Sequence, residues 1–153
     1  MDEPGATLMH NRILLVDNEQ DILDILARVL RSAGYHADMA KDGRLALAQV
    51  SRRDYDLIIS NIRMPVMGGE VFYRQLCASY PDLSKRVIFC TGDIANVSTR
   101  RFLSATGAPV IFKPFQLRTV LDVVSGQLGR LHSAAELPGL PAVRPRTVIA
   151  PAY

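Results

Sequence analysis

The sequence predicts an α/β fold in which five parallel strands form one sheet that helices cover on both faces. Short apolar runs alternate five times with amphipathic stretches along the chain. Each run is hydrophobic throughout rather than at every second residue, which is typical of parallel strands buried on both faces. Strict alternation of strand and helix also favours parallel pairing, because parallel neighbours are joined by right-handed crossovers. These observations together indicate a doubly wound sheet.

The five strands are expected at the apolar runs, which cover residues 12–16, 35–39, 55–60, 86–90 and 109–112. The helices that follow them are expected near residues 21–33, 42–51, 70–79, 94–106 and 116–128. The first helix shows the pattern most clearly, because its apolar residues recur at helical spacing: Ile22, Leu23, Ile25, Leu26, Val29 and Leu30. Gly34 is a suitable residue to end this helix.

The composition is typical of a single globular domain. A length of 153 residues fits one domain. The net charge of +3 comes from scattered arginines rather than one basic stripe, so we expect no nucleic-acid partner. No apolar run approaches the roughly 18 residues needed to span a bilayer, so we expect no membrane association. Cys77 and Cys90 lie in apolar segments without metal-ligand spacing, and we expect two buried thiols in a cytoplasmic protein.

The segments on either side of the alternating pattern differ from it. Residues 1–10 are expected to be a flexible N-terminus, and they contain no apolar stretch typical of a signal peptide. Residues 131–153 form a proline-rich tail, whose prolines are Pro138, Pro141, Pro145 and Pro151. Because proline interrupts helices, we expect this tail to be extended or flexible. Residues 11–130 therefore hold the whole domain.

Polar side chains follow four of the expected strands. Asp17 and Asn18 come after the first strand, Asn61 after the third, Thr91 after the fourth and Lys113 after the fifth. Ligands of open α/β sheets bind beyond the carboxyl ends of the strands, where the strand order reverses. We therefore expect these side chains to meet in one site.

Four segments carry a resemblance to a known family, and they cover residues 13–17 (ILLVD), 61–69 (NIRMPVMGG), 91–93 (TGD) and 113–115 (KPF). In this order, and each at the end of a strand–helix unit, they resemble the receiver domain of response regulators in two-component signalling. The resemblance extends over about residues 11–130. It implies a flavodoxin-like fold with strand order 2-1-3-4-5.

The resemblance also implies a role for each position of the site. In receivers an acidic pair after the first strand and an aspartate after the third bind Mg²⁺, and that third-strand aspartate accepts the phosphoryl group. Asp17 matches the first acid of the pair, and Asn18 matches the second. Asn61 matches the phosphoacceptor, and Arg63 matches the residue whose backbone carbonyl completes the metal site.

Three further positions correspond to the phosphate contacts and the switch of the family. Thr91 and Lys113 match the residues that hold the phosphoryl oxygens. Val110 stands at the position of the aromatic switch residue, so the aromatic side chain of the usual threonine–aromatic coupling is missing. Thr91 is alternatively an N-cap of the next helix, and Lys113 is expected to tether Asp17. Glu19 is expected to point away from the site rather than replace the missing acid.

Amides therefore replace two of the three carboxylates. The amide of Asn61 has no negative oxygen that can attack a phosphoryl group. The loss of two charges also weakens attraction for Mg²⁺, which gives up its water reluctantly. We expect no cofactor, with Mg²⁺ only if the chain accepts phosphate after all.

The first functional hypothesis is a degenerate, non-enzymatic receiver that binds a protein partner without phosphorylation. That partner is expected to be a histidine kinase or another signalling protein, or a second copy of the chain. The expected contact surface is the fourth helix, fifth strand and fifth helix, with Arg100, Arg101 and Arg118 exposed on it. The alternatives are a phosphoaccepting receiver, in which Asn61 stands in for aspartate or another residue is the acceptor, and a flavodoxin-like cofactor enzyme. The last is the weakest, since no glycine-rich loop follows Val16.

Overall fold

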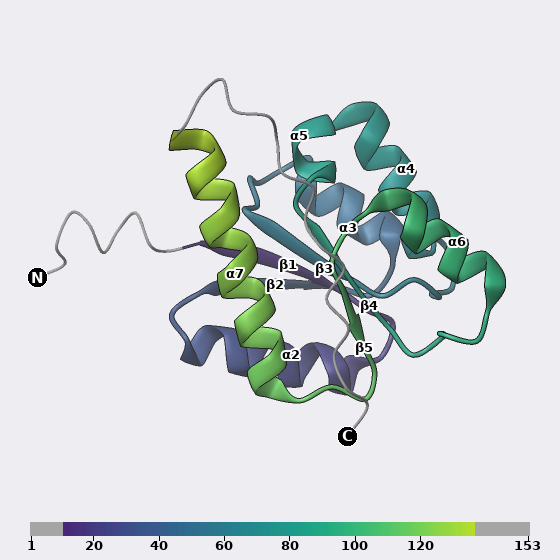
Figure 1. Cartoon of the computed structure of the whole chain (residues 1–153), viewed down its shortest axis with the longest axis horizontal. Coiled ribbons are helices and arrows are strands. Elements are labelled where there is room, and N and C mark those ends of the chain that lie inside the picture. The colour runs from purple at the N-terminus through teal and green to yellow at the C-terminus, as the bar shows by residue number, and fades with distance from the viewer. Residues whose placement is uncertain (1–10, 137–153) are drawn as a thin grey trace, which may run out of the picture.

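The computed structural model describes residues 11–136 and has a five-stranded sheet between two layers of helices (Figure 1). The strands, in chain order, are β1 (Arg12–Val16), β2 (His36–Ala40), β3 (Leu57–Ser60), β4 (Val87–Thr91) and β5 (Val110–Phe112). They are all parallel, and their order in the sheet is β2-β1-β3-β4-β5. The predicted fold class and strand order are confirmed.

The helices cover the two faces of the sheet unequally. They are α2 (Gln20–Ser32), α3 (Gly43–Val50), α4 (Gly69–Ser79), α5 (Pro81–Ser84), α6 (Val97–Thr106) and α7 (Leu117–Glu136). Helices α2 and α7 pack on one face of the sheet. Helices α3, α4 and α6 pack on the other. The polar residues expected to form the site lie at or just beyond the carboxyl ends of the strands: Asp17, Asn18, Asn61, Thr91 and Lys113.

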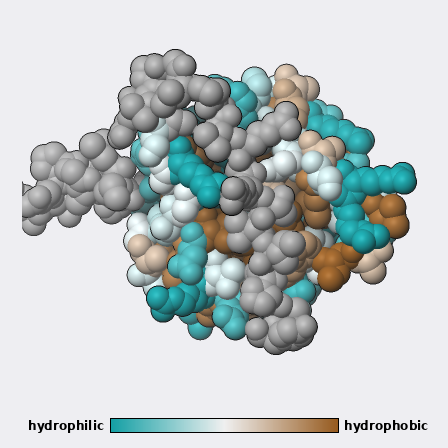
Figure 2. Space-filling model, in the orientation of Figure 1, coloured by the Kyte–Doolittle hydropathy of each residue, from teal (hydrophilic) through white to brown (hydrophobic). Residues whose placement is uncertain are grey.

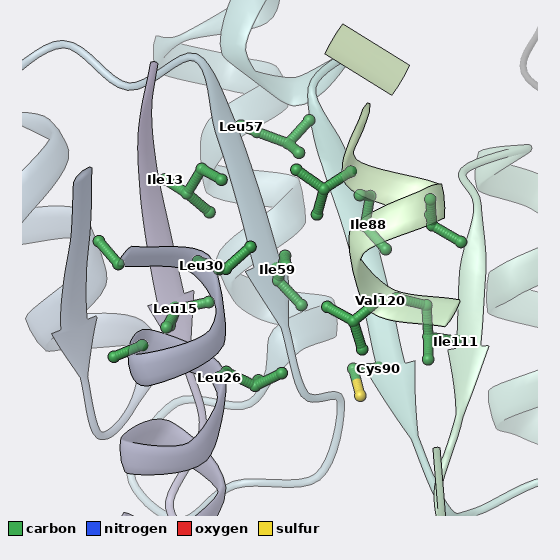
Figure 3. Packing of buried hydrophobic residues seen from close by; sticks show 14 of the residues in the cluster. Ile13, Leu15, Leu26, Leu30, Leu57, Ile59, Ile88, Cys90, Ile111 and Val120 are labelled. Atoms are coloured by element: carbon green, nitrogen blue, oxygen red, sulfur yellow. The ribbon is translucent and has the colours of Figure 1, made fainter. Parts of the chain in front are cut away.

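The pattern of burial explains why the strands are hydrophobic throughout. Ile13 and Leu15 of β1 contact the layer formed by α2 and α7, together with Leu57 and Ile59 of β3 (Figure 3). The intervening Leu14 belongs to the cluster under α3, α4 and α6. Successive side chains of a strand point to opposite faces, and here both faces are covered. The central residues of β1, β3 and β4 are therefore apolar on both faces.

Several element boundaries differ from those expected. Helix α7 ends at Glu136 rather than Leu128, so the expected boundary at residue 130 falls inside a helix. Helix α6 begins only at Val97, because the side chain of Asn96 accepts a hydrogen bond from the Thr99 amide and caps it. The short helix α5 was not expected. The proposed flexible N-terminus (1–10) and most of the proposed tail (137–153) lie outside the described residues.

The expectation of two buried thiols is wrong for Cys77. Cys90 on β4 is buried, but Cys77 is exposed. Phe72 and Leu76 lie four residues apart on the buried side of α4, and the next position along the helix points outward. Ile25, which had been placed in the apolar pattern of the first helix, is also exposed, at 45%.

The edge strand β2 is held by side chains as well as by its pairing with β1. The guanidinium of Arg31 donates a hydrogen bond of 2.6 Å to the carbonyl oxygen of Ala37. On the same strand, Asp38 accepts from the Tyr55 hydroxyl at 2.7 Å and forms ion pairs with Arg12 and Arg53 at 3.3 Å. No helix within residues 11–136 is both long and apolar enough to cross a membrane.

Candidate functional site

The polar residues that follow the strands meet at one end of the sheet. Backbone hydrogen bonds between neighbouring strands fix their positions. The Asn61 amide donates to the Val16 carbonyl at 2.8 Å, and the Lys113 amide donates to the Thr91 carbonyl at 2.8 Å. Because the strands are parallel, their carboxyl ends lie side by side, and the residues that follow them converge as expected.

Lys113 and Asp17 form the most buried charged pair of the site. The ammonium Nζ of Lys113 lies 2.7 Å from Oδ2 of Asp17, and the two side chains are only 15% and 3% exposed. The other carboxylate oxygen, Oδ1, accepts a hydrogen bond of 2.9 Å from the backbone amide of Glu19. Both oxygens of Asp17 are therefore engaged by donors, while Glu19 is exposed.

The amide of Asn61 is fixed by three hydrogen bonds. Its Nδ2 donates to the backbone carbonyl of Arg63 at 3.1 Å and to Oδ1 of Asn18 at 3.2 Å. Its Oδ1 accepts from the backbone amide of Ile62 at 2.9 Å. Since the Arg63 carbonyl can only accept and the Ile62 amide can only donate, these two backbone groups fix which end of the Asn61 amide is nitrogen. The orientation of Asn18 follows in turn, because its oxygen must face the Asn61 nitrogen.

This donor set does not fit Mg²⁺. A Mg²⁺ ion needs oxygen lone pairs arranged as an octahedron, commonly with carboxylate charge. Here the Asn61 nitrogen donates to two of the oxygens at the family's metal-binding positions, those of Asn18 and Arg63. The only carboxylate at these positions, that of Asp17, is bonded to Lys113 and the Glu19 amide.

A second network joins the loops after β3 and β4. Thr91 is almost fully buried, and its hydroxyl accepts a hydrogen bond of 3.1 Å from the Asp93 amide. The Asp93 carboxylate pairs with the guanidinium of Arg63 at 2.5 Å and accepts from the Thr99 hydroxyl at 3.3 Å. Thr91 is therefore not the N-cap of α6, a role that belongs to Asn96. The Arg63–Asp93 pair was not anticipated, although both residues lie in the segments that carried the resemblance.

Comparison with known proteins identifies the family. The family model for the response regulator receiver domain matches residues 13–125. The chain belongs to this family. The chain is 30% identical to the response regulator receiver protein CpdR of Brucella abortus over 117 residues, which are 76% of the chain and 96% of CpdR. A receiver protein of Anaeromyxobacter is 31% identical over 114 residues, 73% of the chain and 46% of that protein.

Solved receiver structures share the fold. A CheY-like receiver domain from Methanospirillum hungatei has a TM-score of 0.74 at 26% identity, over 81% of this chain and 98% of that one. The receiver domain of a histidine kinase from Syntrophus aciditrophicus has a TM-score of 0.73 at 26% identity, over 86% and 97%. The chain spans only 10% of the sensor protein EvgS of Escherichia coli, to which it is 32% identical.

Beneath the site of this receiver lies a thiol that cannot ionise near neutral pH. Burial raises the pKa of Cys90 to about 12, with a smaller opposite effect from the positive charge of Lys113. Cys90 therefore stays protonated and acts as a small apolar core residue. Val110, at the family's switch position, is likewise buried, and it pairs in register with Phe89 of β4. A valine at this position has no ring that could move between the core and the surface.

The loop between β3 and α4 brings backbone very close to Asn61. A Cβ atom on Gly69 would lie 2.2 Å from the Asn61 carbonyl oxygen, so only glycine fits there. The Gly69 amide donates to the Ile62 carbonyl at 2.7 Å and closes this loop. At its tip, Val66 has a φ of 69° and is 76% exposed. A β-branched residue is strained in that left-handed region.

Proposed function

We propose that this receiver acts in the cytoplasm as a protein-interaction module of two-component signalling that does not depend on phosphorylation. The observation that carries the proposal is the hydrogen bonding of the Asn61 amide. Its nitrogen donates to the Asn18 oxygen and the Arg63 carbonyl, the groups that would otherwise serve a metal. Its oxygen is held by the Ile62 amide. The residue at the acceptor position is thus a neutral group with its polar atoms already satisfied.

The chemistry of phosphoryl transfer supports this reading. Transfer to a receiver needs a nucleophilic oxygen, metal ions or cations that neutralise the phosphoryl charge, and accurate positioning. Asn61 supplies no anionic oxygen. The charge of Lys113 is already balanced by Asp17 at 2.7 Å. We therefore infer neither an enzymatic role nor a cofactor, and no catalytic residue is assigned.

The partner is inferred to be a histidine kinase or another signalling protein. Related proteins include a sensor protein and transcriptional regulators, which are longer than this chain. A ligand can shift a conformational equilibrium only if it binds two states with different affinity. Without a phosphoryl group to make that difference, the domain should present one binding surface at all times.

Mass spectrometry of the intact protein after incubation with acetyl phosphate and Mg²⁺ tests the proposal. The natural chain should gain no phosphoryl group, whereas the variant with Asn18→Asp and Asn61→Asp should gain one and serves as the positive control. Light scattering in the same samples should give one oligomeric state for the natural chain, with and without the donor. A phosphorylated natural chain, at any residue, would overturn the proposal, and fragmentation would locate the acceptor.

A further inference from the structure

Helix α6 is held in place by side chains rather than by a close approach of its backbone. Within residues 11–136, every other helix runs close to the backbone of a neighbouring helix or strand over several residues, whereas α6 approaches none so extensively. The buried residues of α6 are Thr99, Phe102 and Leu103. The position of this helix therefore depends on what these side chains contact.

The ring of Phe102 belongs to an aromatic cluster that joins three elements. Its centroid lies 5.2 Å from that of Phe89 on β4, at an interplanar angle of 72°, and 5.7 Å from that of Tyr73 on α4, at 80°. The rings of Tyr73 and Phe89 also contact each other, at 5.7 Å and 63°. All three pairs have the edge-to-face arrangement that aromatic rings prefer. The cluster therefore connects α4, β4 and α6.

The three rings are anchored to different degrees. Phe89 is fully buried on a strand that pairs with a neighbour on each side, so it is the fixed member. Tyr73 is only half-buried. Burial, followed by a hydrogen bond with Cys77, raises the pKa of the Tyr73 hydroxyl. Since Cys77 is exposed, the hydroxyl lies towards the surface while the ring contacts Phe89 and Phe102.

The start of α6 has a second tether. The Thr99 hydroxyl donates to the carboxylate of Asp93 at 3.3 Å, and Arg63 shares that carboxylate. This hydrogen bond is longer than is usual between two oxygens. The ion pair is partly exposed, and such pairs add little stability. The aromatic contacts should therefore contribute more to holding α6 than this tether does.

The aromatic cluster fills the layer into which the side chain of Val110 points. Val110 pairs in register with Phe89, and both belong to the core cluster under α3, α4 and α6. Paired residues of neighbouring strands point to the same face of a sheet. A ring at position 110 would compete with Phe89 and Phe102 for this space. The cluster thus lies where an aromatic switch residue would have to be accommodated.

The orientation of α6 determines which side chains the helix presents to solvent. Val97, Arg100 and Arg101 are exposed, whereas Phe102 faces the core. Figure 2 shows brown apolar atoms beside teal hydrophilic atoms at the side of the molecule where Figure 1 places α6. A rotation of α6 that released Phe102 would change this surface.

We propose that Tyr73 sets the orientation of α6, by holding the ring of Phe102 against Phe89. Tyr73 is a positioning residue, and the aromatic cluster keeps α6 in one place without a phosphoryl group. The proposal rests on the proposed function and names the residue that keeps the domain in one conformation. Without the Tyr73 ring, α6 would retain only the contact between Phe102 and Phe89, the packing of Leu103 and the tether of Thr99.

Hydrogen exchange measured by mass spectrometry, with no phosphodonor added, tests the proposal. Tyr73→Leu should accelerate amide exchange in residues 97–106 by about tenfold or more, because opening α6 no longer breaks two ring pairs. Tyr73→Phe keeps the ring and should leave this exchange almost unchanged. Phe72→Leu is the matched control, since Phe72 is a fully buried ring on the same helix and outside the aromatic cluster. It should accelerate exchange in β1 and β3, which requires global unfolding, but not in α6.

Several outcomes would overturn the proposal. They are unchanged exchange of α6 in Tyr73→Leu, failure of Tyr73→Phe to preserve it, and equal acceleration of α6 by Phe72→Leu. Greater acceleration by Thr99→Val than by Tyr73→Leu would also overturn it, because the tether to Asp93 would then hold the helix.

A double-mutant cycle of Tyr73→Leu and Phe102→Leu gives an independent measurement. Their effects on urea unfolding should be strongly non-additive, since the two rings are in contact. Additive effects would contradict the proposal. Because no phosphodonor takes part in either experiment, they can fail while the mass-spectrometric test of phosphorylation succeeds, or the reverse.

Discussion

The side-chain nitrogen of Asn61 lies 3.2 Å from the side-chain oxygen of Asn18, so the two residues that replace acids in this site bind each other. A pair of carboxylates at these positions would repel. The two amides instead form a hydrogen bond, and the second Asn61 N–H reaches the Arg63 carbonyl. Asparagine at one of these positions is therefore compatible with asparagine at the other, because the Asn61 amide donates to the Asn18 amide.

Asn61→Asp alone should destabilise the domain in the absence of divalent metal. The new carboxylate would still accept from the Ile62 amide, but its other oxygen would face the Arg63 carbonyl. An unmatched pair of acceptors in a buried site costs about 1–3 kcal/mol. Urea unfolding in the presence of a chelator measures the change. Asn96→Asp is the control, because an aspartate there still accepts from the Thr99 amide and should leave stability almost unchanged.

Restoring both acids should create a metal site that neither single change creates. Calorimetric titration of the natural chain with Mg²⁺ should show no saturable binding at low millimolar concentration. The variant with Asn18→Asp and Asn61→Asp should bind Mg²⁺. Its gain in binding free energy should exceed the sum of the gains of the two single variants, since both charges act on one ion. Metal should also recover the stability that this variant loses in chelator. Saturable binding by the natural chain would contradict the account of the amide site.

Removing Lys113 should be costly, because Asp17 would remain buried without its partner. Lys113→Met is expected to lower the free energy of unfolding by about 3 kcal/mol. Adding Asp17→Asn should return part of this loss, since the uncompensated charge is then gone. A double-mutant cycle from urea unfolding gives the coupling. Additive effects would show that the ion pair between Lys113 and Asp17 contributes nothing to stability.

Only one of the two thiols should react in the folded protein. Cys77 is exposed, whereas Cys90 is buried and its pKa is raised to about 12, so Cys90 carries no thiolate near pH 8. Titration with a colourless aromatic disulfide that releases a coloured thiolate should count one thiol in buffer and two in denaturant. Cys77→Ser should abolish the reaction in buffer. A reactive Cys90 in that variant would mean that β4 is more open than the structure shows.

Val66→Gly should stabilise the domain slightly. A non-glycine residue in the left-handed region costs about 1–2 kcal/mol, and the flexibility of glycine in the unfolded chain returns about 0.5–1 kcal/mol of that. Val66 is 76% exposed, so little packing is lost. Thermal unfolding should show a higher midpoint. Val71→Gly, at an exposed position of α4, should instead lower it, because glycine weakens helices.

Most of the fold could be predicted because the signals were local. The strands are hydrophobic throughout because their side chains reach both core clusters, as those of β1 do. The predicted bounds of β1 are those that the structure has. The end of α7 was misplaced because Gly129, a residue type that commonly ends helices, follows Leu128 directly, yet the helix continues through it to Glu136. Cys77 was misplaced because a helix with apolar residues on several sides does not reveal which side meets the sheet.

The site was predicted in its membership and in the bond between Lys113 and Asp17, but not in the rest of its bonding. The resemblance placed Asp17, Asn61, Thr91 and Lys113 at one end of the sheet, where the structure also has them. The direction of the Asn61 amide depends on the Ile62 and Arg63 backbone, and that geometry exists only after the loop closes on Gly69. The Arg63–Asp93 pair likewise joins two loops that are distant in the sequence, so spacing alone gave no signal for it.

The position of the Arg31 guanidinium over the edge strand β2 should reduce aggregation through that edge of the sheet. An incoming strand that tried to extend the sheet beyond β2 would need the carbonyl oxygen of Ala37, which Arg31 already holds at 2.6 Å. The incoming strand would also approach the positive charge of the Arg31 side chain. Open edges of sheets are where aggregation starts, and charged residues on them discourage it. Arg31 thus acts as a gatekeeper, and its replacement by leucine would expose a template for aggregation during concentration or refolding.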